Sequence, residues 1–165
     1  MIDSIPAGLY RTTTPLPDHE EAVPAGALVF VGQRADGRRF VVRPGSNRKN
    51  RWFWAEPTLP LPASGWMWTL YALPREGFYT LPETIELDRG GRWLKGAIVQ
   101  LGYNEAGRGI VFIAEQHEAS DDNVLRFASR GRLVEDALLE RLVWAPILPV
   151  SAPADGGAID PEQAN

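Results

Sequence analysis

The chain has 165 residues, of which 44% are hydrophobic and 10% aromatic, and it carries a formal net charge of −4 at pH 7. This composition is typical of a folded globular protein and excludes a disordered or fibrous one. The absence of cysteine excludes disulfides and thiolate metal sites, and the acidic balance argues against a general nucleic-acid binder. No apolar run approaches the ~18 residues of a membrane helix, and the N-terminus lacks the pattern of a signal peptide. We therefore expect a cytoplasmic protein without membrane contact.

Five short strands are predicted in the first half of the chain. Their residues are largely β-branched and aromatic, which is typical of strands, and glycine or proline lies between them. The polar turn over 34–39, which joins two such runs, indicates a β-hairpin. The predicted strands cover residues 8–10, 27–33, 39–44, 50–56 and 69–73.

The second half of the chain repeats this order of landmarks. Gly26 and Gly96 lie 70 residues apart, and so do Gly32 and Gly102. Further landmarks match with offsets that drift by only a few residues, as changes in loop length would cause. We interpret the chain as two tandem copies of one unit. The second copy should form strands over 77–79, 97–103, 109–115, 123–129 and 141–145.

Each unit resembles an SH3-like barrel in strand count, unit length and turn position. We therefore expect an all-β protein made of two packed SH3-like repeats, residues 1–75 and 76–148, with a flexible tail over 149–165. Apolar residues at helical spacing within 132–144 predict one short helix before the last strand. The alternative is a single larger barrel or sandwich in which the two halves pair edge to edge.

The strongest candidate for a binding site is a basic stretch that leads into a Trp-Phe-Trp sequence in the first half. Alternation along a strand would place its two tryptophans on one face, and residues 65–71 are interpreted in the same way. Aromatic faces flanked by cations bind bases, prolines or aromatic side chains. The candidate partner-binding residues are Arg43, Arg48, Lys49, Arg51, Trp52, Trp54, Trp66 and Trp68.

Comparison of the two halves supports this choice. Where the first half has its first tryptophan pair, the second half has Val124, Leu125 and Phe127, so the core of the unit does not require these tryptophans. The alternative is that the tryptophans seal the contact between the two barrels, with arginines stacked on their outer rims. The matching loop of the second half, Glu115 to Asp122, is acidic and would suit a basic partner, or it is simply a solvated loop.

Signals for catalysis are weak. His19 and His117 each lie among carboxylates but without a recognised metal-ligand spacing, and neither a G-x-S-x-G elbow nor a phosphate-binding loop is present. We expect no catalytic residues, metal or cofactor. The arginine excess over two lysines, Lys49 and Lys95, suggests a bacterial source.

These features favour a non-catalytic protein-binding module, such as a bacterial adaptor, inhibitor or immunity-type protein, whose partner is another protein. The first alternative is single-stranded nucleic-acid binding through the same stretch, which should weaken steeply with salt. A second alternative is a small metal-dependent hydrolase built around His117. The sequence does not indicate an oligomeric state.

Overall fold

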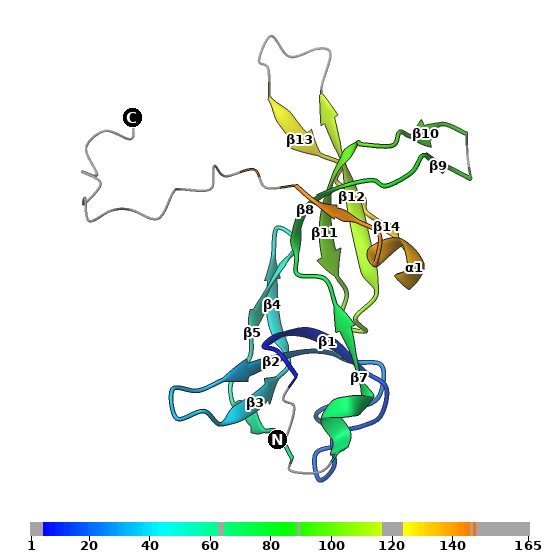
Figure 1. The fold of residues 1–165 in the computed structure, drawn as a ribbon. Coiled ribbons are helices and arrows are strands. Elements are labelled where there is room, and N and C mark those ends of the chain that lie inside the picture. Colours follow the sequence, from blue (N-terminus) through cyan, green and yellow to red (C-terminus); the bar gives the residue numbers. More distant parts are fainter. Residues whose placement is uncertain (1–4, 63–64, 89, 117–123, 146, 148–165) are drawn as a thin grey trace, which may run out of the picture.

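The computed structural model describes residues 5–62, 65–88, 90–116, 124–145 and 147, so the tail predicted over 149–165 lies outside the described residues. Within these ranges the protein is almost entirely β-sheet, with one short α-helix, α1 (Asp136–Leu139), and one 3-10 helix, η1 (Gly65–Thr69). The all-β class and the short helix near the C-terminus are confirmed. Figure 1 shows two lobes, with the N-terminal strands below and the C-terminal strands above.

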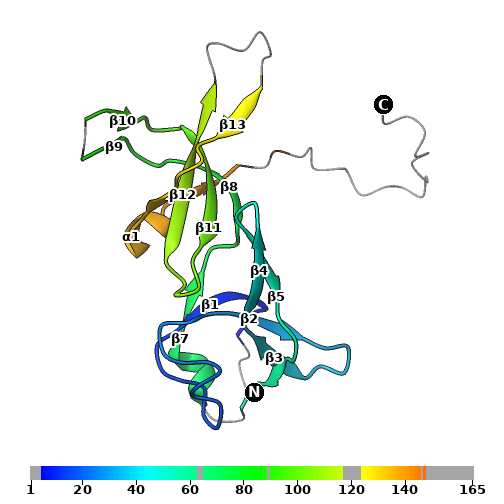
Figure 2. The ribbon, with the colours of Figure 1, turned by 180° about the vertical axis from the view of Figure 1, so that it is seen from behind.

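The first lobe is a five-stranded antiparallel sheet with strand order β6-β3-β2-β1-β7. A separate hairpin, β4–β5, extends from this lobe and lies beside β11 of the second lobe when the molecule is seen from behind (Figure 2). The strands are β1 (Gly8–Thr12), β2 (Leu28–Gln33), β3 (Arg39–Val42), β4 (Pro44–Arg48), β5 (Arg51–Trp54), β6 (Leu59–Pro60) and β7 (Leu70–Leu73).

The second lobe is a sheet with strand order β13-β12-β11-β8-β15, in which β14 also pairs with β12. A short hairpin, β9–β10, projects from it near the top of Figure 1. The strands are β8 (Gly77–Thr80), β9 (Ile85–Glu86), β10 (Arg92–Trp93), β11 (Ile98–Tyr103), β12 (Gly109–Gln116), β13 (Leu125–Phe127), β14 (Arg132–Leu133) and β15 (Val143–Trp144). Across the described ranges no strand of one lobe pairs with a strand of the other, so the alternative of edge-to-edge pairing between the halves is wrong.

The two sheets pair residues in matching registers. Tyr10 lies opposite Val29 in the first lobe, and Tyr79 lies opposite Val99 in the second. Other pairs that correspond in the two lobes are Gly32–Phe40 and Gly102–Ile110, Val41–Leu59 and Val111–Arg132, and Tyr10–Ala72 and Tyr79–Trp144. Both halves of the chain therefore arrange their strands in the same order.

The core of the second lobe includes side chains from the first. Side chains alternate between the two faces of a strand, so Tyr10 packs into the core of its own lobe while its neighbour Leu9 packs into the core of the other. Leu28 and Leu73 join Leu9 there, against buried residues that include Leu101. The first sheet is thus covered on both faces, and the lobes pack extensively.

An ion pair also joins the lobes. The guanidinium of Arg11 on β1 hydrogen bonds both carboxylate oxygens of Asp136 in α1, and it lies 4.8 Å from the ring centroid of Tyr71. The Arg11 hydrogen bond holds the pKa of the Asp136 carboxyl below its ordinary value of 3.8. Helix α1 is therefore tied to the first lobe.

The strand predicted over residues 65–71 is wrong in its first part. Gly65–Thr69 forms the 3-10 helix η1, and the strand begins only at Leu70. In a helix with three residues per turn, side chains two positions apart point in different directions. Trp66 is accordingly 5% exposed while Trp68 is 60% exposed, so the two tryptophans do not share a face.

Candidate functional site

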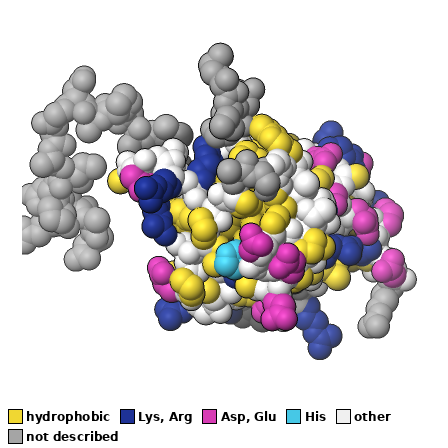
Figure 3. Space-filling model, turned by 90° about the horizontal axis from the view of Figure 1, so that it is seen from below, with side chains coloured by type: hydrophobic (Ala, Val, Ile, Leu, Met, Phe, Trp, Pro, Cys, Tyr) yellow, Lys and Arg dark blue, Asp and Glu magenta, His cyan; other side chains and the backbone are white. Residues whose placement is uncertain are grey.

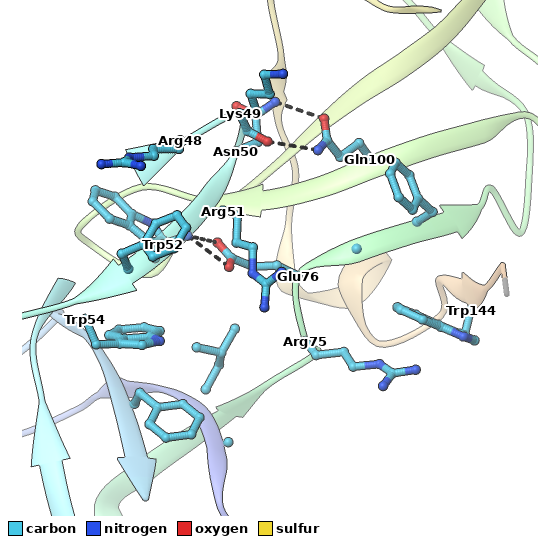
Figure 4. Close-up of a pocket in the computed structure, with 16 residues that line it drawn as sticks. Arg48, Lys49, Asn50, Arg51, Trp52, Trp54, Arg75, Glu76, Gln100 and Trp144 are labelled. Carbon is cyan, nitrogen blue, oxygen red and sulfur yellow. Dashed lines mark hydrogen bonds between the residues drawn. The ribbon is translucent and has the colours of Figure 1, made fainter. Parts of the chain in front are cut away.

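A groove with a volume of about 720 Å³ lies where the β4–β5 hairpin meets β8 (Figure 4). The hairpin, with its two tryptophans, forms one side, and Arg75, just before β8, and Trp144 on β15 lie on the other. Sites that bind small molecules or short segments have volumes of about 300–1,000 Å³. The groove is therefore large enough to take a ligand of this size.

The tip of the hairpin is fixed on the second lobe. Lys49 and Asn50 form a two-residue loop with φ values of 51° and 64°, the left-handed conformation of a type I′ turn, which asparagine tolerates. The Asn50 side chain donates a 3.0 Å hydrogen bond to Gln100 on β11, and the Gln100 amide donates a 3.0 Å bond to the Lys49 carbonyl. The hairpin therefore bridges the two lobes and closes one side of the groove.

Trp52 and Trp54 share one face of β5, as alternation predicted. Both rings are half-buried and pack against the core of the second lobe, whereas Arg51 and Phe53 are exposed. The indole N–H of Trp52 donates a 2.8 Å hydrogen bond to the Tyr103 carbonyl. Each tryptophan thus contributes to the contact between the lobes and still presents part of its ring to the groove.

Four cations line the groove: Arg48, Lys49, Arg51 and Arg75, here called the basic cluster. Among the described parts of the chain, no salt bridge joins the basic cluster to a carboxylate. Arg48 instead lies 5.4 Å from the ring centroid of Phe53, which is 48% exposed. The groove is thus a basic surface on a chain whose net charge is −4.

Glu76 is the carboxylate that lines the groove. Its two oxygens accept the backbone N–H of Trp52 at 3.1 and 3.3 Å. Burial raises the pKa of the Glu76 carboxyl above its ordinary value of 4.5, although the Trp52 hydrogen bond and the charge of Arg51 oppose this shift. An anion held at this position repels other anions and can accept further N–H groups.

Trp144 is held in place on the opposite side of the groove. The Arg75 guanidinium lies 3.6 Å from its ring centroid, and Tyr79 meets the same ring edge-to-face at 5.2 Å. A Cβ at Gly77 would lie only 2.6 Å from the Trp144 ring, and the φ of 151° at this glycine also disfavours a side chain. The ring therefore packs directly against the backbone and remains 38% exposed.

Three residues that line the groove were not predicted from the sequence: Arg75, Glu76 and Trp144. For Trp144 a signal was available, because the matching residue of the first half is Ala72, which faces Tyr10 as Trp144 faces Tyr79. Searching for residues that the second half has and the first half lacks would have identified it. Arg75 and Glu76 lie in the short connection between β7 and β8 and carry no such signal.

The remaining predicted residues lie away from the groove. Arg43 is half-buried and donates a 3.1 Å hydrogen bond to the Leu28 carbonyl, and burial lowers the pKa of its guanidinium. Trp66 is in the core of the first lobe and donates to the Thr14 carbonyl at 3.1 Å. The structure thus brings together five of the eight predicted residues: Arg48, Lys49, Arg51, Trp52 and Trp54.

The possible metal sites are not supported by the described residues. His19 is the single histidine among the described residues, and the face seen in Figure 3 carries several acidic side chains. No group of three or more potential ligands that could hold a metal ion occurs within the described ranges. His117 and most of the acidic loop up to Asp122 lie outside them.

Comparison with protein-family models, with curated proteins and with solved structures finds no match to this chain. Among the helices that the structure describes, none has the length and apolarity needed to cross a membrane.

Proposed function

We propose that this protein is a non-catalytic protein-binding module that holds a segment of another protein in the groove. The observation that carries the proposal is the basic cluster, which meets partly buried tryptophans on one concave surface without salt bridges among the described residues. Tryptophan and arginine are the residues most enriched at the energetic centres of protein interfaces. A bacterial adaptor, inhibitor or immunity-type protein in the cytoplasm would bind its partner through such a surface without catalysing a reaction.

We further infer that the two lobes are tandem copies of one SH3-like unit. The matching strand orders and registers support this inference. In this view the groove occurs where the copies differ. Trp54 pairs with Pro44 in the first lobe, and its counterpart Phe127 pairs with Ala114 in the second. Residues that one copy has and the other lacks are not required by the shared fold and are available for binding.

Single-stranded nucleic acid is the second candidate ligand. The stacking of Arg48 on the exposed ring of Phe53 favours it, because exposed aromatic rings beside cations form a platform for bases. Glu76 disfavours it, because a carboxylate in the groove repels phosphates. The two ligands differ in salt dependence, since neutralising each phosphate contributes about −0.7 to the slope of log K against log salt for single strands.

Quantitative affinity capture from the native cell tests the proposed function. The three baits are the wild type, Arg51→Ala in the groove, and the matched control Arg126→Ala, which removes an exposed arginine from β13 outside the groove. We expect one or more proteins to be retained by the wild type and the control and lost by Arg51→Ala. Retention of the same proteins in the same amounts by all three baits would contradict the proposed function.

A further inference from the structure

We propose that the groove accepts an extended, acidic peptide segment that carries an aromatic or proline residue as its anchor. This inference rests on the proposed function and specifies the chemistry of the partner. The charge of the groove favours an acidic segment: among the described residues, four cations and one carboxylate line it, while the chain as a whole is acidic. A basic cleft on an acidic protein attracts an anionic segment locally and repels polyanions at longer range.

The aromatic side chains of the groove favour an aromatic or proline residue as the anchor of the peptide. Trp54 lies 5.4 Å from Phe30, with the two rings tilted by 32°, and its ring is half-buried. On the other side, Trp144 is supported by Arg75 and remains partly exposed. Partly exposed aromatic rings that are held in place by their packing bind aromatic or proline rings at little cost in conformational entropy.

Glu76 favours a peptide over a nucleic acid. A peptide backbone presents an N–H at each non-proline residue, whereas a phosphodiester backbone presents only anionic oxygens. The two oxygens of Glu76 have about four acceptor positions in total, and among the described residues the Trp52 N–H is the donor that occupies part of them. The carboxylate can therefore accept a peptide N–H, while it would repel a phosphate.

The unpaired edge of β5 favours a bound peptide segment in an extended conformation. Within the part of the chain that is described, β5 pairs only with β4, so its other edge has no partner strand there, and its four residues line the groove. At this edge the N–H of Trp52 is satisfied by the Glu76 side chain and not by a neighbouring strand. A segment lying along the groove would run beside this edge of β5. In an extended conformation it would also contact the Trp52 and Trp54 rings over the greatest length.

Selection from a library of random twelve-residue peptides displayed on phage tests the inference. The targets are the wild type, the double variant Arg48→Glu/Arg51→Glu, and the control Arg126→Glu/Arg130→Glu, whose arginines are exposed outside the groove. Peptides recovered on the wild type should be enriched in Asp and Glu next to an aromatic residue or proline. Labelled copies of these peptides should bind the groove variant at least tenfold more weakly and the control equally well. Unchanged denaturation midpoints show that the variants are folded.

The outcomes separate the two proposals. Recovered peptides that depend on the groove but are basic or uncharged would overturn this inference and leave the proposed function standing. Peptides that bind all three targets equally would count against both. Recovery of no peptide that depends on the groove, or a fifteen-nucleotide oligo-dT that binds the groove more tightly than every peptide, would also overturn the inference. Partner loss on Arg51→Ala in affinity capture tests the proposed function separately.

Discussion

The indole N–H of Trp52 donates a 2.8 Å hydrogen bond to the carbonyl oxygen of Tyr103, which links the candidate binding hairpin to the second lobe. Trp52 also lines the groove, and its ring is half-buried. The two roles considered for the tryptophans, partner binding and sealing the contact between lobes, therefore do not exclude each other at this residue. Variants of Trp52 report on stability, whereas variants of the exposed Arg51 test the proposed binding.

Trp52→Phe should lower the free energy of unfolding by about 1 kcal/mol. The substitution keeps an aromatic ring but removes the donor to the Tyr103 carbonyl, and a typical hydrogen bond contributes about 0.5–1.5 kcal/mol. Urea denaturation measures the change. Trp68→Phe is the control, because its side chain is 60% exposed, and it should stay within about 0.5 kcal/mol of the wild type. Equal effects of the two substitutions would contradict the structural role of Trp52.

Gly102→Val should destabilise the protein by about 1–3 kcal/mol, the usual cost of overpacking. A Cβ at Gly102 would lie 3.1 Å from the carbonyl oxygen of Asn50, at the point where the hairpin tip contacts β11. At Gly8 a Cβ would meet only the Tyr10 ring, at 3.9 Å, so Gly8→Val should cost less. A denaturation midpoint for Gly102→Val equal to that of the wild type would refute the close contact.

The stability of Glu76→Gln relative to the wild type should increase as the pH rises from below 4.5 to neutral. The pKa of Glu76 is raised in the folded state, so ionisation opposes folding and the wild type loses stability as the pH rises through the folded pKa. Glutamine keeps an oxygen acceptor for the Trp52 N–H but does not titrate. Urea denaturation of both proteins across this pH range measures the difference, which would be independent of pH if burial did not raise the pKa.

Asp136→Asn should show the opposite dependence on pH. Arg11 lowers the pKa of the Asp136 carboxyl, so this pair stabilises the protein above the ordinary pKa of 3.8 and loses its contribution as the pH falls through the folded value. The variant should therefore be less stable than the wild type at neutral pH, and the two should converge in acid. A difference in unfolding free energy that stays constant as the pH falls would show that ionisation of Asp136 does not contribute to stability.

The sequence predicted those features that depend on local pattern. Alternation in Arg51–Trp54 placed Trp52 and Trp54 on one face, and the glycine-containing turns separated the strands correctly. The prediction failed at Trp66, whose spacing from Trp68 suits a strand but whose indole N–H bonds Thr14, distant in sequence. The burial of Arg43 likewise depends on its hydrogen bond to the Leu28 carbonyl, a contact that no local sequence pattern shows.

The groove required information from both lobes. Its basic and aromatic hairpin was visible as an excess of the first half over the second, but Arg75 and Trp144 reach it only because the lobes pack against each other. Glu76 was not distinguishable from a solvated glutamate in the sequence. Its position beside the Trp52 N–H follows from the docking of the hairpin on β11 of the second lobe.

The affinity of Arg51→Ala for a groove-selected acidic peptide tests the central claim most directly. Fluorescence anisotropy with one labelled peptide at fixed salt gives Kd for the wild type, for Arg51→Ala and for the control Arg126→Ala. An arginine at the centre of a binding site contributes about 2 kcal/mol, so Kd should rise about thirtyfold for Arg51→Ala and stay unchanged for the control. Equal Kd values for Arg51→Ala and Arg126→Ala would contradict the assignment of the groove as the binding site.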